Sequence, residues 1–184
     1  MNTHVTIDPS TVTPQADDFR EAMRQLAGGV AVITAGFGAE RTGMTATSVS
    51  SLSVDPPSLV VCVNRQSSTL LALLRFRAFG VSILRANQEA IAERFSGRGG
   101  LKGAARFGDE PWLTLATGAP RLASALAAID CSVEETIDRH SHAIVIGRVE
   151  AVRTRGSAGG LVYWRGRYSA LGGATDPVET RQAS

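Results

Sequence analysis

Gly43-Met-Thr-Ala-Thr-Ser-Val-Ser-Ser-Leu-Ser-Val-Asp-Pro-Pro57 is a neutral, hydroxyl-rich stretch up to Asp55, and the apolar run Ser58-Leu-Val-Val-Cys-Val63 follows it at once. Six of the nine residues from Thr45 to Ser53 carry a hydroxyl group, and no charge appears before Asp55. If the stretch is one strand, neither of its alternating faces is apolar enough for an ordinary core strand. Neutral donors suit a flat heteroaromatic ligand, because hydroxyl and backbone N–H groups can meet ring nitrogens and oxygens. A serine- and threonine-rich edge strand or loop is the alternative interpretation.

The overall composition indicates an ordinary globular protein. The 184 residues suit one domain with a full-sized core, and the net charge of +2 does not call for a polyanion partner. No apolar stretch approaches the roughly 20 residues that span a bilayer, and the N-terminus has no signal-peptide pattern. Cys62 and Cys131 both lie in apolar runs, which favours buried thiols in a reducing compartment. We therefore expect a cytoplasmic protein with neither a nucleic-acid nor a membrane partner.

Strand patterns outnumber helix patterns along the chain. Helices are expected around residues 17–27, around residues 70–77 and after Asn87. The β-like segments are Val30–Thr34, Leu59–Val63, Phe79–Leu84, Leu122–Glu134, Ala143–Val152 and Leu161–Leu171, with the stretch quoted above between the first two. Because strands and helices do not alternate, a parallel βαβ sheet is disfavoured. The pattern predicts a mainly β protein, an antiparallel, partly open barrel with a few flanking helices over residues 17–171. Residues 1–16 are expected to form a flexible arm and residues 172–184 a flexible tail.

Two segments have the composition of anion sites. Gln66, Ser67 and Ser68 lie in a turn that opens a helix, and helix N-termini favour anions. An ordinary serine cap is the alternative. Arg98 and Lys102, on a glycine-rich loop, can add positive charge to the same anion. Arg165-Gly-Arg-Tyr168 is the second segment, which suits either a solvated edge or an anion and ring-stacking site.

His140-Ser-His142 raises the question of a metal site, because residues i and i+2 of a strand share a face. The only other histidine is His4, and no carboxylate follows at a matching spacing. A single functional imidazole is therefore favoured over a metal site. Nucleophilic catalysis is also disfavoured, since there is no Gly-x-Ser-x-Gly turn and both thiols have apolar neighbours.

Taken together, these segments resemble the flavin reductase-like family, the small reductase components of two-component flavin-dependent monooxygenases. The resemblance runs from about Phe19 to Leu171. It rests on an ordered set of motifs: Phe19-Arg, Leu26-Ala-Gly-Gly-Val-Ala-Val-Ile-Thr34, Gly43 to Pro57, Asn64 with Ser67-Ser-Thr69, Phe79-Gly-Val-Ser-Ile-Leu84, Glu93-Arg-Phe95, Asp130-Cys131, His142 with Ile146-Gly-Arg-Val149, and Tyr163 with Arg165-Gly-Arg-Tyr168.

The resemblance implies an FMN-binding split β-barrel that forms a homodimer. It also implies that NADH or NADPH reduces FMN or FAD, and that the reduced flavin is released to a partner monooxygenase. His142 would be the catalytic residue near the nicotinamide. The cofactor-binding residues would be Thr45, Ala46, Thr47, Ser48, Val49, Ser50 and Ser51 at the ring and ribityl chain, Gln66, Ser67, Ser68 and Arg98 at the phosphate, and Arg165, Gly166, Arg167 and Tyr168 near the pyridine nucleotide. No metal is expected.

One residue departs from the family pattern. Family members commonly carry Gly-Asp before the histidine, whereas this chain has His140-Ser141, so the partner that orients His142 is left open. Two rival functions also remain. One is a split-barrel flavin-binding or electron-transfer protein without NAD(P)H activity, and the other is a metal-dependent β-barrel that uses His140 and His142.

Overall fold

A computed structural model describes residues 15–156 and 158–172. Most of the predicted arm (1–14) and tail (173–184) therefore lies outside the described residues. The helices are α1 (Ala16–Arg24), α2 (Ser68–Phe76) and α3 (Glu89–Ser96), with short 3₁₀ helices at Gly38–Glu40 and Gly103–Phe107. The strands are β1 (Gly28–Gly29), β2 (Ala31–Ala35), β3 (Thr42–Ala46), β4 (Val49–Val54), β5 (Pro57–Asn64), β6 (Ala78–Ile83), β7 (Trp112–Leu113), β8 (Arg121–Leu122), β9 (Ala127–Arg139), β10 (His142–Thr154), β11 (Gly160–Trp164) and β12 (Arg167–Leu171).

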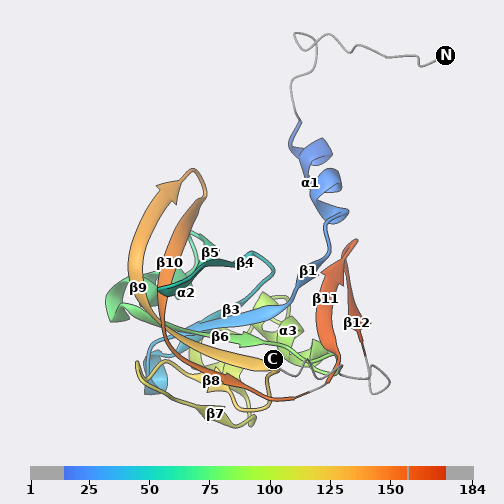
Figure 1. The fold of residues 1–184 in the computed structure, drawn as a ribbon. Coiled ribbons are helices and arrows are strands. Elements are labelled where there is room, and N and C mark those ends of the chain that lie inside the picture. Colours follow the sequence, from blue (N-terminus) through green and yellow to red (C-terminus); the bar gives the residue numbers. More distant parts are fainter. Residues whose placement is uncertain (1–14, 157, 173–184) are drawn as a thin grey trace, which may run out of the picture.

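A seven-stranded sheet forms the body of the molecule, with the order β3-β2-β6-β9-β10-β5-β4 and antiparallel neighbours throughout. Its first and last strands, β3 and β4, are joined only by Thr47 and Ser48. The two edges of the sheet therefore meet at this link, and the sheet curls into a barrel (Figure 1). The prediction of an antiparallel barrel with few helices is confirmed.

The interpretation of Thr45 to Ser53 as a single strand is wrong. The chain leaves β3 after Ala46 and enters β4 at Val49, on the other edge of the sheet. Ser48 supports this crossing, because its hydroxyl donates to the carbonyl oxygen of Cys62 on β5 at 3.1 Å. The hydroxyl residues thus belong to two strands and the link between them.

Two apolar cores lie on opposite faces of β2, all of whose residues are buried. Ile33 packs with Phe79, Val145 and the α2 residue Leu73, while Val32 packs in the second core, which contains Phe95 of α3. Because successive strand residues face opposite sides, one strand serves both cores. Helices α2 and α3 are fixed against the barrel in this way.

The predicted strand Leu161–Leu171 is instead a hairpin. Arg165 and Gly166 have φ values of 48° and 80°, and two consecutive positive φ angles are typical of the tightest hairpin turns. Strands β1, β11 and β12 form a small separate sheet. The hairpin of β9 and β10 is also tighter than predicted, since its strands extend to Arg139 and from His142.

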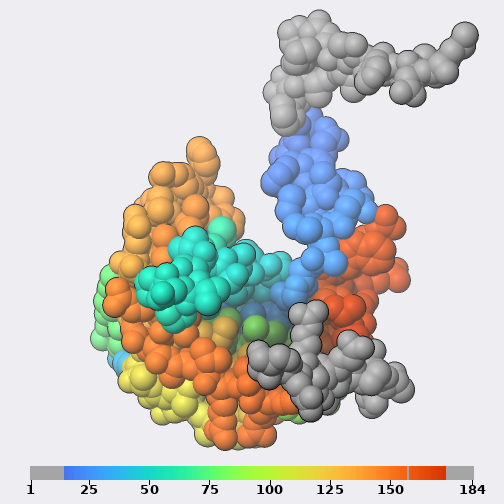
Figure 2. Space-filling model, in the orientation of Figure 1, coloured from blue at the N-terminus to red at the C-terminus, as the bar shows by residue number. Residues whose placement is uncertain are grey.

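Helix α1 forms as predicted, yet none of its residues is buried. Its apolar Phe19 and Met23 are 64% and 46% exposed, and the helix stands away from the barrel (Figure 1, Figure 2). Its C-terminal end is held by the β11–β12 turn, where Trp164 Nε1 donates to the carbonyl oxygen of Gln25 at 3.2 Å. Across residues 15–156 and 158–172, no helix has the length and apolar character needed to span a membrane.

Candidate functional site

The turn before α2 has the geometry of an anion cradle. Ser67 is the N-cap of α2, and its hydroxyl accepts a hydrogen bond from the Thr69 amide at 3.1 Å. The Ser68 and Thr42 hydroxyls lie 3.2 Å apart, so the helix start is tied to β3. Gln66 is exposed, and its backbone N–H donates to the side-chain oxygen of Asn64 at 2.8 Å. The start of the helix presents positive partial charge and small polar side chains, which suits a phosphate group.

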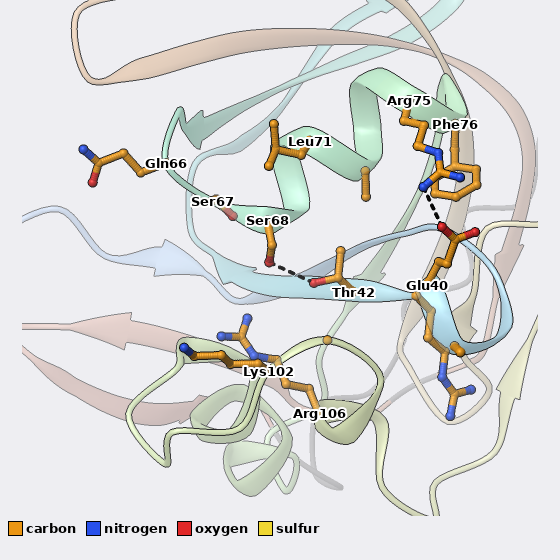
Figure 3. A pocket seen from close by; sticks show the side chains of 14 residues that line it. Glu40, Thr42, Gln66, Ser67, Ser68, Leu71, Arg75, Phe76, Lys102 and Arg106 are labelled. Atoms are coloured by element: carbon orange, nitrogen blue, oxygen red, sulfur yellow. Dashed lines mark hydrogen bonds and ion pairs between the residues drawn. The ribbon is translucent and has the colours of Figure 1, made fainter.

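A cavity of about 680 Å³ opens from this cradle. It lies between α2 on one side and the Glu40–Thr42 and Lys102–Arg106 segments on the other (Figure 3). Four cationic side chains line it, those of Arg41, Arg75, Lys102 and Arg106, against the single carboxylate of Glu40. The surplus of positive charge fits an anionic ligand. We refer to this space as the cationic cavity.

The cationic side chains of this cavity differ in how far they are already engaged. Arg75 forms an ion pair with Glu40 at 2.5 Å. Arg106 donates to the carbonyl oxygens of Gly43 and Leu101. The Lys102 side chain is exposed and has no hydrogen bond or ion pair to any of the described residues. Lys102 is therefore the charge most available to a ligand.

Arg98, predicted to approach the phosphate, does not line the cationic cavity. Its guanidinium group contacts Glu93 at 3.0 Å and the Tyr163 hydroxyl at 3.2 Å. Lys102 and Arg106 stand opposite Ser68 in its place (Figure 3). The sequence pointed to Lys102 through its glycine-rich loop, whereas no local pattern marked Arg41, Arg75 or Arg106.

A second cavity, of about 460 Å³, lies between α1 and the link from β3 to β4. It brings together Thr47 and Ser48 of the predicted ring wall with Arg165 and Gly166 of the predicted nucleotide segment. The rest of its lining consists of Phe19, Arg20, Met23 and Arg24 of α1, followed by Leu26, Gly28 and Tyr163. We refer to this space as the α1 cavity.

The other predicted wall residues lie on different elements. The Thr45 hydroxyl donates to the Ala92 carbonyl oxygen of α3 at 2.6 Å, and Ala46 is buried in the core. Val49 packs partly against the same core. Ser50 and Ser51 are exposed on the edge strand β4. Only Thr47 and Ser48 of the stretch from Thr45 to Ser51 line the α1 cavity.

The two arginines of the predicted nucleotide segment, Arg165 and Arg167, differ in whether their side chains already have partners. Arg165 donates twice to Gln25 Oε1, at 2.9 and 2.7 Å, and its guanidinium carbon lies 4.7 Å from the centre of the Trp164 ring. The Arg167 side chain is exposed and has no hydrogen bond or ion pair within residues 15–156 and 158–172. Tyr168 pairs with Tyr163 at 5.0 Å between ring centres. Of the two arginines, Arg167 is thus the one whose charge is available to a ligand.

His142 begins β10 and is exposed, opposite Asn64 of β5. Ser141 Oγ lies 2.9 Å from its Nδ1 atom, so the serine is in hydrogen-bonding contact with the ring. His142 lines neither the cationic cavity nor the α1 cavity. Among the described residues, no cluster of three or more histidine, cysteine or acidic side chains has the arrangement of a metal site.

Comparison with known proteins identifies the family. The model of the flavin reductase like domain matches residues 23–172. This chain belongs to the flavin reductase-like family. The predicted resemblance is confirmed, and so is the prediction of a flavin oxidoreductase.

Members of the family with known names or structures cover nearly the whole chain. The chain is 41% identical to FMN reductase (NADH) RutF 2 of Methylorubrum extorquens, over 91% of this chain and 95% of that protein. The styrene monooxygenase flavin reductase of Pseudomonas putida S12 has a TM-score of 0.74 at 31% identity, covering 84% of this chain and 97% of that one. The NADH:FAD oxidoreductase SgcE6 of Streptomyces globisporus has a TM-score of 0.78 at 28% identity, covering 93% and 99%.

Proposed function

We propose that this protein uses NADH to reduce a flavin held along β3, and releases the reduced flavin to a partner monooxygenase. The observation that carries the proposal is the order of the two cavities. The cationic cavity includes Thr42 at the start of β3, and the α1 cavity includes Thr47 just after its end. Five residues of strand span about 17 Å. A flavin nucleotide has its phosphate and its ring at opposite ends, so it suits two sites spaced in this way.

The residues present fit such a ligand chemically. The phosphate would be held by the amides at the start of α2, the Ser68 hydroxyl and the Lys102 ammonium group. The ring would lie against Thr47 and Ser48, which offer neutral donors and small side chains. A bound flavin supplies the redox chemistry by accepting a hydride from the nicotinamide. The protein has to orient the two rings and exclude water, and no acid–base pair is required of it.

His142 is proposed to bind the nicotinamide side of the pyridine nucleotide, with Ser141 setting the orientation of the ring. The contact between Ser141 Oγ and His142 Nδ1 supports this role, because it leaves Nε2 facing away from the serine as the atom that can meet a ligand. Arg167 and Tyr168 are proposed to contact the remainder of the nucleotide. The free guanidinium of Arg167 is suited to a phosphate oxygen.

We also propose that the protein is a homodimer. Phe19 and Met23 of α1 and Leu26 just after it are exposed, and Leu52 and Val54 are exposed on the edge strand β4. Large exposed apolar side chains on an unpaired edge are typical of an interaction surface. Sedimentation of the full chain should give twice the monomer mass, and a monomer at micromolar concentration would contradict the proposal.

A cytoplasmic location is proposed from the two thiols. Cys62 and Cys131 are both free, and free thiols are typical of reducing compartments.

The test is an assay of the purified protein with NADH and free FMN or FAD, followed at 340 nm. We expect flavin-dependent loss of absorbance, and NADPH should be run in parallel. A protein that binds flavin but oxidises neither pyridine nucleotide would instead be the rival binding or electron-transfer module. A partner monooxygenase that depends on reduced flavin should become active when this protein, NADH and flavin are supplied, even where the two proteins are kept from contact and only the flavin can diffuse between them.

A further inference from the structure

The cationic cavity continues well past the phosphate cradle. Helix α2 runs from Ser68 to Phe76, a distance of about 12 Å. The cavity follows the helix over this length, since Leu71, Arg75 and Phe76 also line it. In Figure 3 the cradle lies at one end and Arg75, Phe76 and Glu40 lie at the other. A ligand that ended in a single phosphate at Ser68 would leave this far end empty.

The far end has the features of a site for a flat ring. Leu71 is 66% exposed, although it is a large apolar residue. The Arg75 guanidinium carbon lies 5.0 Å from the centre of the Phe76 ring, and its ion pair with Glu40 holds it there. The outer face of a guanidinium group fixed in this way can stack on an aromatic base. We call Leu71, Arg75 and Phe76 the α2 shelf.

Glu40 adds a polar contact at the same end. Its Oε1 atom is engaged by Arg75, whereas its Oε2 atom has no hydrogen bond to the described residues. A carboxylate oxygen accepts hydrogen bonds only, so the free atom suits an exocyclic amino group such as that of adenine. At the cradle end, Lys102 and Arg106 face α2 across the cavity. Two cationic side chains there carry more positive charge than one phosphate group needs, which suits a second phosphate next to the first.

We infer that the cationic cavity binds the adenosine diphosphate part of FAD, with the adenine ring on the α2 shelf. This inference rests on the proposed function, because it places the flavin ring at the other end of β3. It makes FAD the preferred flavin of this chain. It also assigns the preference for FAD over FMN to the three residues of the α2 shelf, which would contact neither the flavin ring nor the phosphate group that FMN also carries.

The test compares the dissociation constants of FMN and FAD by titration calorimetry, without any pyridine nucleotide. Stacking of one base on a planar side chain is worth about tenfold or more in affinity, so FAD should bind the unmodified protein at least about tenfold more tightly than FMN. Arg75→Gln should reduce this preference to within about twofold and leave FMN binding unchanged. The ion pair of Arg75 is exposed, so its loss costs little stability.

A matched pair of leucine substitutions separates the shelf from the rest of the helix. Leu71→Ala should weaken FAD binding about threefold without affecting FMN. Leu74→Ala is the control, because Leu74 is an exposed residue of the same helix that does not line the cavity; both flavins should bind it as before. Equal affinities for FMN and FAD, or equal losses for both in Arg75→Gln or Leu71→Ala, would overturn the inference.

The two proposals fail in different ways. A protein that prefers FAD in calorimetry but oxidises no NADH contradicts the proposed function alone. A protein that oxidises NADH with FMN and shows no preference for FAD contradicts the present inference alone.

Discussion

Arg121 and Asp130 form an ion pair that is shut off from water, with 3.2 Å between Nη1 and Oδ2 and side chains that are 1% and 0% exposed. Asp130 also accepts hydrogen bonds from the amide and hydroxyl groups of Thr117. The guanidinium nitrogens of Arg121 have no well-formed hydrogen bond among the described residues. Burial holds the pKa of Arg121 below its usual value, against the opposing effect of Asp130.

The pair should be costly to break on one side only. Asp130→Ala leaves a buried, uncompensated cation, and we expect a loss of about 3–5 kcal/mol in the free energy of unfolding. The double variant Arg121→Met with Asp130→Ala should lose clearly less, because it leaves no charge behind. Urea unfolding of both single variants and the double variant gives the coupling energy directly. Additive losses would show that the two side chains do not act as a pair.

Stability should fall at high pH because of Cys131. Burial raises the pKa of this thiol to about 12, above its ordinary value near 9. The unfolded chain therefore loses the proton first, so the stabilisation is fully present below about pH 9 and is lost as pH rises towards 12. The loss attributable to this thiol is at most about 4 kcal/mol. Cys131→Ala should reduce the slope of unfolding free energy against pH between 9 and 11, whatever its effect at pH 7.

Gly28 should be required at the α1 cavity. A Cβ atom added there would stand 2.9 Å from the Cβ of Thr47, whereas one added at Gly29 would meet no atom within 4 Å. Gly28→Ala should therefore displace the link between β3 and β4 and weaken flavin binding about fivefold or more, while Gly29→Ala should not. Calorimetry with FMN measures both. Equal affinities of the two variants for FMN would show that the flavin ring does not bind in the α1 cavity.

Lys102 and Arg98 provide a test of which cation meets the flavin phosphate. Lys102 lines the cationic cavity and has no partner there, while Arg98 is engaged by Glu93 and Tyr163. Lys102→Gln should weaken FMN binding about five- to tenfold, in line with the loss of one charge-assisted hydrogen bond. Arg98→Gln should change it less than about twofold. A larger loss of affinity in Arg98→Gln than in Lys102→Gln would support the prediction from the sequence that Arg98 contacts the phosphate.

Arg165 should act on α1 rather than on the nucleotide. Its two hydrogen bonds to Gln25 tie the β11–β12 turn to the end of the helix. Arg165→Ala should speed amide exchange in residues 16–24 several-fold, because an exposed helix with no buried residue depends on such contacts. Arg167→Ala is the control, which should leave exchange unchanged and raise the KM for NADH. Unchanged exchange in Arg165→Ala would remove this anchoring role.

Much of the fold follows from local sequence signals. The apolar runs of β2, β5, β6 and β10 lie where the pattern predicted strands, and the serine turn at Ser67 opens α2 as predicted. The break after Ala46 escaped prediction, because Thr47 and Ser48 carry none of the glycine, proline or asparagine signals that mark turns. The extra turn at Arg165 and Gly166 was missed because the aromatic residues around it all favour strands.

The site was harder to predict, since its charges come from distant segments. Lys102 reaches the start of α2 across 34 positions of sequence, and Arg165 finds its partner Gln25 across 140. Arg98 lies on the same glycine-rich loop as Lys102, but its guanidinium group donates to the Tyr163 hydroxyl instead of lining the cavity. Residue type and spacing indicate that a cation of this loop lies near the start of α2, whereas the packing of the loop decides whether that cation is Arg98 or Lys102.

The two-residue link at Thr47 and Ser48 couples the width of the barrel to the shape of the α1 cavity. The edge strands β3 and β4 are not paired with each other, so this short link limits how far apart the two edges can lie, and it also lines the cavity. An inserted residue would let the edges move apart and enlarge the cavity in the same step. Sequence length between these two strands is thus a constraint on ligand shape, independent of which side chains the link carries.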